Sequence, residues 1–318
     1  MKLGLAALPI LAALAGAPPL AGQPQTAAAI VPDSAATVLD LEPDRSDRMT
    51  VPVSIGGRGP YAFIVDTGAE RTSIAEELAQ DLRLGHGARA RLHSMTEVSR
   101  IQTVLIPALE VGGRSIRGIN APALERRHIG AEGILGVDSL QTQRVSFDFA
   151  RRQMTVSLSR KREEAWPDDT IVITARNRMG HLVMVDAAVD GEKVWVILDT
   201  GAETTVANSV LRRKLEKRGK ALATWPIELQ SVTGGRMPAD QSMMRKIRLG
   251  GVDINNMPVA FADVHPFRKL GLTRRPALLL GMDALRLFER VSVDFPNRRV
   301  RLLPAGSAER AGAQWALR

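Results

Sequence analysis

The feature that most constrains this chain is an internal duplication that spans most of its 318 residues. Three short motifs occur twice and in the same order: an apolar run ending in Asp-Thr-Gly-Ala-Glu, a Leu-Gly pair, and Arg-Val-Ser-x-Asp-Phe. Their positions are 63–70 and 196–203, 133–140 and 278–285, and 144–149 and 290–295. Two copies are too few for a solenoid, so the duplication predicts two related lobes.

Both halves show the same pattern of expected elements, and most of these elements are strands. Apolar segments precede each Asp-Thr-Gly motif, and apolar residues at helical spacing follow it. The expected strands and hairpins lie at 51–55, 109–116, 145–149 with 154–158, 183–185, 247–254, and 291–295 with 300–303. The expected helix N-caps are Ser73, Asn208, Asp138 and Asp283. The pattern predicts a mainly β fold with short helices.

The duplication also divides the chain into two lobes with segments before, between and after them. The N-terminal segment joins Lys2 to a Leu/Ala-rich run too short to span a bilayer comfortably, which is typical of a secretory signal. Cleavage after Ala17, cleavage after Gly22 and retention as an anchor are the alternatives for this segment. The expected parts are a signal peptide 1–22, a leader 23–46, a first lobe 47–158, a linker 159–169, a second lobe 170–304 and a C-terminal tail 305–318.

Composition excludes several classes of protein and indicates where the chain works. The absence of cysteine excludes disulfide scaffolds, thiolate zinc sites and cysteine nucleophiles, and it suits a periplasmic or secreted bacterial protein. The five histidines lack metal-ligand spacing, so we expect no metal and no other cofactor. Aromatic residues make up only 4% of the chain, which argues against a nucleic-acid partner. The net charge of +9 leaves association with an anionic membrane surface as an alternative.

The two Asp-Thr-Gly motifs, each with a downstream Leu-Gly pair, resemble the retropepsin-like aspartic peptidase superfamily. The resemblance covers roughly residues 48–158 and 170–304, and the chain is similar to bacterial exported aspartyl proteases with two fused Asp-Thr-Gly lobes. The resemblance implies a bilobal, pseudo-two-fold fold of two retropepsin-like β-barrel units. It further implies a catalytic dyad of Asp66 and Asp199, loop support by Thr67, Gly68, Thr200, Gly201, Gly136 and Gly281, and substrate binding by Ala69, Glu70, Ala202, Glu203, Thr233 and Gly234.

Two aspartates delivered by two lobes have a definite chemistry. Carboxyl groups within hydrogen-bond range cannot both ionise, so they share one proton. The ionised group then takes a proton from a water molecule, while the protonated group polarises a peptide carbonyl. The residues therefore predict a monomeric aspartic endopeptidase that acts on polypeptides. A non-catalytic peptide-binding module of the same fold, and a protease whose active site forms between two chains, are the alternatives.

The residues that follow each aspartate have expected roles in holding the loops. Thr67 and Thr200 are expected to hydrogen-bond across the two-fold axis and fix the two loops. Gly68 and Gly201 are expected to leave room for the substrate backbone.

The chain departs from both pepsin-like and retroviral enzymes. Its only tyrosine, Tyr61, precedes the first motif and cannot serve as the flap tyrosine of pepsin-like enzymes. Retroviral enzymes place arginine after the motif glycine, where this chain has Val137 and Met282, so the resemblance does not supply an arginine partner for the acid after each Asp-Thr-Gly-Ala. Segments 94–97 and 231–235 occupy matching places in the two halves and are the candidate flaps.

The residue after each Asp-Thr-Gly carries an expectation about pH. Pepsin-like enzymes commonly have serine or threonine there, and its hydroxyl stabilises the ionised carboxylate. Ala69 and Ala202 cannot donate such a hydrogen bond, so the lower apparent pKa of the dyad should be less depressed. We therefore expect a mildly acidic to near-neutral optimum, roughly pH 5–7.

Overall fold

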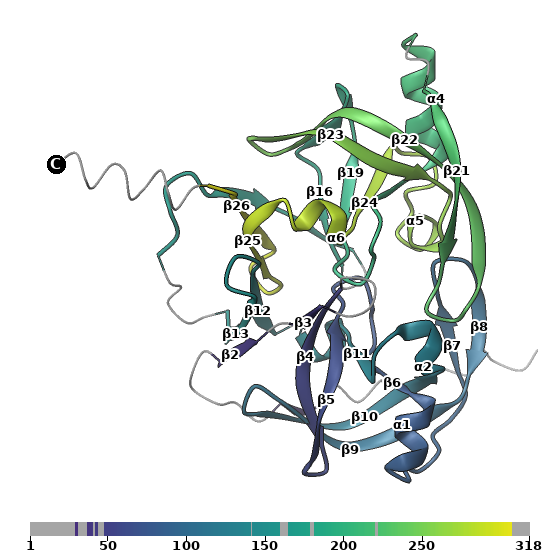
Figure 1. Ribbon diagram of the computed structural model, residues 1–318, viewed down its shortest axis with the longest axis vertical. Coiled ribbons are helices and arrows are strands. Elements are labelled where there is room, and N and C mark those ends of the chain that lie inside the picture. Colours follow the sequence, from purple (N-terminus) through teal and green to yellow (C-terminus); the bar gives the residue numbers. More distant parts are fainter. Residues whose placement is uncertain are drawn as a thin grey trace, which may run out of the picture.

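The computed structural model describes residues 29–30, 37–40, 42–43, 48–140, 142–159, 165–178, 181–219 and 222–306. The expected signal peptide and most of the expected leader, linker centre and C-terminal tail lie outside these residues. The described part is mainly β with six short helices, and it forms two lobes, seen in Figure 1 with the first lobe below in purple to blue and the second above in green to yellow. The predicted fold class is confirmed.

The first lobe is a closed barrel of six strands. Its strands pair in the order β4-β5-β11-β6-β10-β9, and β9 returns to pair with β4. The elements of this lobe are β4 (Met49–Ile55), β5 (Arg58–Val65), β6 (Ser73–Ala75), α1 (Glu76–Asp81), β7 (Ala90–His93), β8 (Val98–Ile101), β9 (Thr103–Val111), β10 (Arg114–Leu124), α2 (Arg126–Ile129), β11 (Gly133–Leu135) and α3 (Val137–Leu140).

The second lobe repeats this connectivity. Its order β19-β24-β20-β23-β22 corresponds to β5-β11-β6-β10-β9, and the counterpart of β4 is broken into β16, which pairs with β19, and β17, which pairs with β22. The elements are β15 (Arg176–Arg178), β16 (His181–Met184), β17 (Ala187–Val189), β18 (Glu192–Lys193), β19 (Trp195–Leu198), β20 (Val206–Ala207), α4 (Ser209–Lys217), β21 (Thr224–Gln230), β22 (Arg236–Leu249), β23 (Val252–Phe261), α5 (His265–Lys269), β24 (Ala277–Leu280) and α6 (Met282–Leu285).

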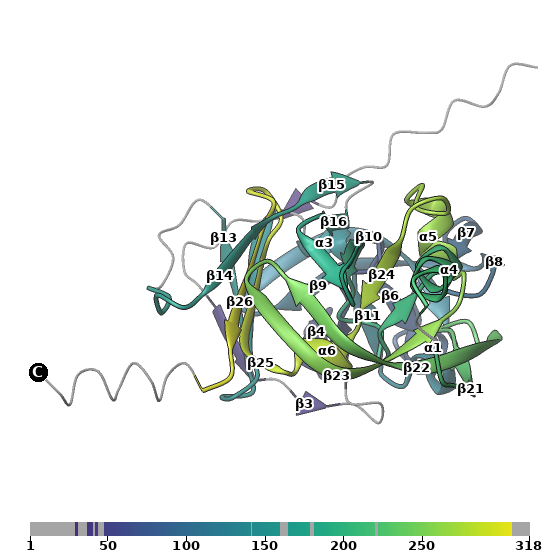
Figure 2. The same cartoon turned by 90° about the horizontal axis from the view of Figure 1, so that it is seen from above.

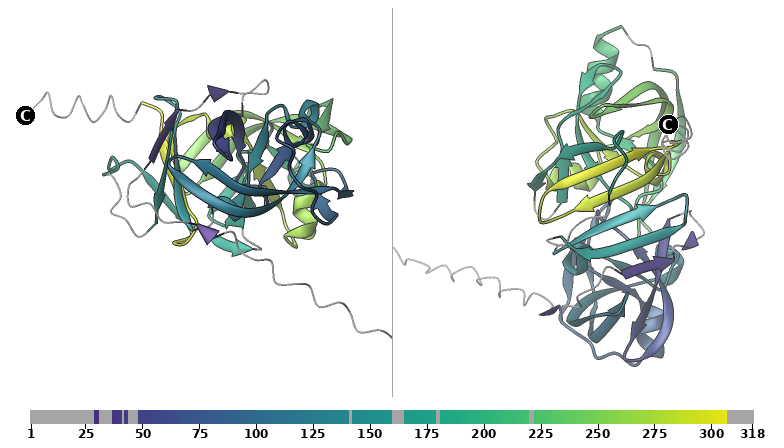
Figure 3. Two further views of the ribbon diagram at one scale, coloured as in Figure 1. Left: turned by 90° about the horizontal axis from the view of Figure 1, so that it is seen from below. Right: turned by 90° about the vertical axis from the view of Figure 1, so that its left-hand side faces the viewer.

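A six-stranded sheet joins the lobes, in the order β14-β26-β25-β12-β13-β2. Figure 2 shows its strands gathered on the left side of the molecule, and the right-hand view of Figure 3 shows it between the lobes. At its centre β12 and β25, two copies of one motif, run antiparallel with Ser146 opposite Ser292, so the approximate two-fold axis passes between them. The bounds are β2 (Thr37–Asp40), β12 (Gln143–Asp148), β13 (Gln153–Leu158), β14 (Ile171–Thr174), β25 (Phe288–Asp294) and β26 (Arg299–Pro304).

The described parts of the expected leader are paired with the first half of the chain. Strand β2 adds to β13, β1 (Ala29–Ile30) pairs with β10, and β3 (Glu42–Pro43) pairs with β4. The segment therefore contributes three short strands to sheets that the sequence pattern assigned to residues after 47. Among the described helices, none has the length and apolar character needed to cross a membrane.

Two of the expected helix caps can be compared directly with the helices that form. Asn208 caps α4 as predicted, because its side chain accepts a hydrogen bond from the Leu211 amide at 3.1 Å. The expectation for Ser73 is wrong: α1 begins at Glu76, and Ser73 lies in β6, where it is opposite Ile134 of β11. Pairing with the central strand of the barrel draws the first residues after the loop into the sheet and delays the start of the helix.

Candidate active site

The two Asp-Thr-Gly loops meet at the interface between the lobes. Asp66 directly follows β5 and Asp199 directly follows β19. Each loop starts in the same way, because the Asp66 amide donates to the Leu135 carbonyl and the Asp199 amide to the Leu280 carbonyl, both at 3.0 Å. A side-chain hydrogen bond joins the two aspartates. Both aspartates of the candidate dyad therefore come from one chain and touch one another.

The two threonines lock the loops together across the axis, as predicted. The Thr67 amide donates to Thr200 Oγ1 at 3.0 Å, and the Thr200 amide donates to Thr67 Oγ1 at 3.2 Å. Each hydroxyl then donates to a carbonyl of the opposite lobe, Thr67 to Leu198 at 3.1 Å and Thr200 to Val65 at 2.6 Å. Both threonines are buried, so four hydrogen bonds shielded from water hold the loops in register.

The glycines of the two motifs make room for the opposite aspartate. A Cβ atom at Gly68 would overlap the Asp199 carboxyl group, and a Cβ atom at Gly201 would overlap the Asp66 carboxyl group. We expected these glycines to leave space for the substrate backbone. In the structure the carboxyl group of the opposite aspartate takes that space. The dyad itself requires the space, because the two carboxyl groups can approach only over loops without side chains.

Backbone amides in each loop hold the carboxylates in place. Asp66 Oδ1 accepts the amides of Gly68 at 2.7 Å and Ala69 at 2.9 Å. Asp199 Oδ1 accepts the matching amides of Gly201 at 3.0 Å and Ala202 at 3.1 Å. These bonds stabilise the charged form of each aspartate and orient its second oxygen away from its own loop.

The Leu-Gly motifs lie directly under the loops. A Cβ atom at Gly136 would lie 2.5 Å from the Arg71 carbonyl carbon, and one at Gly281 would lie 2.8 Å from the Thr204 carbonyl carbon. The amides of Gly136 and Gly281 each donate at 3.1 Å to the hydroxyl of a loop threonine. The close approach of backbone to backbone explains why a glycine stands at each position.

Asp138 and Asp283 bind the loops rather than cap the helices that follow them. Asp138 Oδ1 accepts the amide and the hydroxyl of Thr72 at 2.9 and 2.8 Å, and Asp283 accepts the amide and the hydroxyl of Thr205 at 2.9 and 2.6 Å. The capping prediction fails because each acid lies within the first turn of its helix, not before it. Burial raises the pKa of both carboxyls.

The pKa values of the two candidate catalytic aspartates are both raised, but not equally. Burial raises the pKa of Asp66, and the amides of its own loop, the hydrogen bond with Asp199 and the charge of Arg48 oppose that rise. Burial raises the pKa of Asp199 well above its ordinary range, and the neighbouring Asp66 charge adds to the effect. The two aspartates therefore titrate as one pair, with the pKa of Asp199 raised further than that of Asp66.

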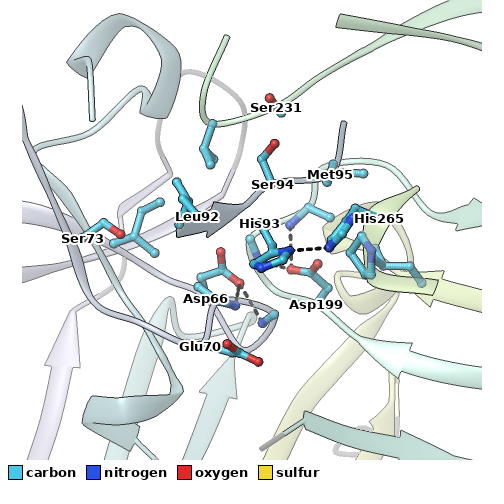
Figure 4. Close-up of a pocket in the computed structure, with 18 of the residues that line it drawn as sticks. Asp66, Glu70, Ser73, Leu92, His93, Ser94, Met95, Asp199, Ser231 and His265 are labelled. Atoms are coloured by element: carbon cyan, nitrogen blue, oxygen red, sulfur yellow. Dashed lines mark hydrogen bonds between the residues drawn. The ribbon is translucent and has the colours of Figure 1, made fainter. Parts of the chain in front are cut away.

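A cavity of about 420 Å³ lies over the dyad, between the lobes. Four of the predicted substrate-binding residues line it: Ala69, Glu70, Ala202 and Glu203. Two hairpins reach over it, β7–β8 from the first lobe and β21–β22 from the second, here called the first flap and the second flap (Figure 1). Figure 4 shows residues of both flap tips, among them Ser94, Met95 and Ser231, around the space above the two aspartates.

The other two predicted substrate contacts, Thr233 and Gly234, do not line this cavity. The tip of the second flap crosses onto the first lobe, where Thr233 Oγ1 donates to Glu97 Oε1 at 3.2 Å. A Cβ atom at Gly234 would lie 2.5 Å from the His128 ring. Thr233 instead lines a second cavity of about 530 Å³ between α1 and β8. Both residues lie in the turn of a hairpin that reaches past the cleft, so they contact the opposite lobe and not the cavity.

Glu70 has cationic partners that the sequence pattern did not predict. Its Oε1 lies 2.7 Å from Lys269 Nζ and 3.7 Å from His181 Nε2, both from the second lobe. The neighbouring His181 imidazole, then the ion pair with Lys269, hold the pKa of Glu70 at about 2. The duplication did contain a signal: His181 stands 18 residues before Asp199, as Arg48, another cavity residue, stands 18 before Asp66 (199 − 181 = 66 − 48).

Two further histidines line the cavity, although the sequence indicated no role for them. His93 lies at the end of β7 and His265 at the start of α5, and their ring nitrogens approach to 2.6 Å. No local pattern joins residues that are 172 positions apart. Within the described residues, no three His, Asp or Glu side chains form a group that could hold a metal ion.

Comparison with family models gives a separate match for each half of the chain. Residues 51–142 match the family described as gag-polyprotein putative aspartyl protease, and residues 185–284 match the family described as aspartyl protease. Each match contains one Asp-Thr-Gly motif and one Leu-Gly pair. A search of curated proteins returned no match. The two matches support a retropepsin-like aspartyl protease family.

Proposed function

We propose that this chain of the retropepsin-like aspartyl protease family is an aspartic endopeptidase with Asp66 and Asp199 as its dyad. One observation carries the proposal. The half-buried Asp66 and the buried Asp199, one from each lobe, share a hydrogen bond at the base of a cavity, and the pKa values of both are raised. That arrangement matches the needs of a reaction that uses one acid and one base on the same water molecule.

In the proposed reaction one aspartate acts as the base and the other as the acid. Ionised Asp66 takes a proton from a water molecule, and the resulting oxygen attacks the scissile carbonyl carbon. Asp199 gives its proton to the carbonyl oxygen, so that charge does not build up in the tetrahedral intermediate. The proton taken by Asp66 then goes to the leaving nitrogen as the C–N bond breaks, and one hydroxyl of the intermediate returns a proton to Asp199 as the C=O bond re-forms, so the dyad regains its single shared proton. The dyad titrates as a pair throughout.

The cavity supports a polypeptide as the substrate. Residues from both loops line it on either side of the dyad, with Ala69 and Glu70 from one lobe and Ala202 and Glu203 from the other. Walls on both sides suit a chain that continues beyond the cut bond in both directions. Because one chain supplies both aspartates, we also propose that the active species is a monomer.

Export belongs to the same proposal. It rests on residues 1–22, which read as a signal peptide and lie outside the described residues, and on the absence of cysteine. We propose a periplasmic or secreted location. The net charge of +9 supports contact with an anionic membrane surface as an accompanying interaction.

An unbiased peptide-library digest tests the proposal. The wild-type chain should cut peptides at internal bonds, as read by mass spectrometry, with one new amine and one new carboxylate per cut. Asp199→Asn should leave the library intact, whereas Asp168→Asn, a matched change at an exposed aspartate of the linker, should cut like the wild type. An intact library with the wild-type chain, or the same cuts with Asp199→Asn, would overturn the proposed function.

A further inference from the structure

The two histidines over the dyad join the first flap to the opposite lobe. His93 Nδ1 and His265 Nε2 lie 2.6 Å apart, and the ring centroids are 4.7 Å apart at 30°. His93 belongs to the flap strand β7, and His265 is the first residue of α5 in the second lobe. Figure 4 shows the pair above Asp199, with the hydrogen bond drawn between the rings.

The flap tip beside this pair is attached to the same helix. The His265 amide donates to the Met95 carbonyl at 2.8 Å. The Met95 side chain packs against the apolar cluster of the second lobe that includes Phe267 and Leu270 of α5. The histidine pair is thus the ionisable part of a contact, here called the latch, that holds the first flap over the cavity.

The second flap has no such group at the matching place. Its tip begins at Ser231 as the first tip begins at Ser94, so Gln230 stands where the first flap has His93. A glutamine amide does not titrate in the physiological range. The pH dependence of the latch therefore originates in the first flap, and it reaches the second flap only through the tip contacts Thr96–Ser231 and Thr233–Glu97.

The short distance between the ring nitrogens limits how many protons the pair can hold. One hydrogen fits between two nitrogens at this separation, and it is present when both rings are neutral or when one is protonated. When both rings are protonated, both facing nitrogens carry hydrogen, the bond is lost and two positive charges repel. Double protonation and the latch are incompatible.

The surroundings make the second proton still less favourable. Burial, then neighbouring positive charges, lower the pKa of both histidines below the ordinary 6.5. The one acid facing the pair is itself bound to Lys269 at 2.7 Å, which limits its compensating effect. The charged groups that face the pair are Arg91 on β7, Arg268 and Lys269 on α5, and Glu70 after β5.

We propose that His93 and His265 are positioning residues that hold the first flap closed only while at most one of them is protonated, so that acid releases this flap. The role of the flap in catalysis rests on the proposed function, but the release itself does not. Because the latched histidines bind fewer protons than released ones, the latch is fully present above about pH 6.5 and weakens as pH falls below it. Each proton taken up on opening raises the open-to-closed ratio about tenfold per pH unit.

The absence of native cysteine allows the flap position to be measured without any turnover. Spin labels on cysteines introduced at Val98, opposite His93 in the flap, and at exposed Thr273, after α5, report the distance across the latch. At about pH 7.5 we expect one short, narrow distance distribution. At about pH 4.5 we expect a longer and broader distribution, reversible on returning to pH 7.5.

Two variants separate the latch from general effects of acid. In the labelled chain with His93→Gln and His265→Gln, the short distance should persist at both pH values, because glutamines hydrogen-bond without titrating. His86→Gln, a histidine outside the latch, should keep the wild-type response. An unchanged wild-type distance at low pH, or the same opening in the double glutamine variant, would overturn the proposal. Since no substrate is involved, this result is independent of whether the chain cleaves peptides.

Discussion

The two catalytic loops of this molecule are nearly the same, whereas the walls around them differ. In each loop one aspartate oxygen accepts two amides, a threonine bonds across the axis, and a half-buried acid under the loop holds a second threonine. The equality has a physical reason. Two carboxyl groups can share a proton only if each loop presents its own group in a matching pose, so a change in either loop disturbs both.

The differences lie around the loops, in the charged groups that neighbour each aspartate. Arg48 of the first lobe lowers the pKa of Asp66, whereas the corresponding His181 of the second lobe binds Glu70. For Asp199 the neighbouring Asp66 charge adds to the rise in pKa caused by burial. The comparison teaches that the two loops present their carboxyl groups in the same way, and that the surroundings of the two groups differ.

The largest expected effect is the loss of either aspartate, which tests the equality of the loops. Asp66→Asn and Asp199→Asn should each lower kcat/KM by at least about a thousandfold, and the double variant should lose little more, because the two act as a unit. Steady-state kinetics on one cleaved peptide measure this. Near-full activity in either single variant, with circular dichroism showing a folded chain, would break the comparison at its root.

The glycines under the loops come next in expected effect. Gly136→Val and Gly281→Val insert side chains against backbone atoms, so each should lower the free energy of unfolding by about 1–3 kcal/mol and kcat/KM by at least about tenfold. Gly136→Val should be the worse, because its contact is closer. Gly85→Val is the matched control, since a Cβ atom there meets nothing within 4 Å. If all three variants behaved alike, Gly136 and Gly281 would have no role in supporting the loops.

A smaller effect concerns the titration of the dyad. Ala69→Ser with Ala202→Ser adds hydroxyl donors to the ionised dyad, so the acidic limb of the kcat/KM profile should move down by about half to one pH unit. The wild-type optimum should lie at roughly pH 5–7, because burial raises both pKa values. Ala62→Ser on exposed strand surface is the control. A limb that stays in place would show that other groups set the titration.

The smallest expected effect tests one of the differences around the loops, the ion pair of Glu70. The pKa of Glu70 is lowered to about 2 from 4.5, so its ion pair adds stability above pH 4.5 that is lost as the pH falls toward 2. Since the Glu70 side chain is 41% exposed, Glu70→Gln should cost only about 0.5–1 kcal/mol at pH 7. Thermal unfolding at several pH values measures the difference, which should shrink in acid. The exposed Glu110→Gln should show no such trend, and a pH-independent cost for Glu70→Gln would remove the ion pair from the account.

Much of the fold and the centre of the site could be predicted from the sequence because the duplication is local and repeated. The apolar run before each Asp-Thr-Gly motif had to be a buried strand, and the terminal hairpins at 145–158 and 291–303 followed from alternation and turns. The cross-axis bonds of Thr67 and Thr200 followed once two lobes were expected. Each of these short-range patterns occurs in both halves of the sequence, and the repetition strengthens the prediction of the fold.

The walls of the cavity were not predictable in the same way. His93 meets His265 because the first flap lies on α5, and Glu70 meets Lys269 because the first Asp-Thr-Gly loop lies beside the same helix. Such contacts depend on how two barrels dock, and no spacing in the sequence encodes that geometry. The prediction for Thr233 was wrong because the tip of the second flap reaches the tip of the first flap, where Thr233 binds Glu97.

The most direct test of the central claim is to mix the two inactive chains. Asp66→Asn and Asp199→Asn, folded together in equal amounts, contain intact Asp199 on one chain and intact Asp66 on the other. If each active site forms within one chain, as the cross-axis bonds indicate, the mixture should be as inactive as either variant alone. Recovery of a substantial fraction of wild-type peptide cleavage in the mixture would show that active sites form between chains, and would contradict the intramolecular dyad.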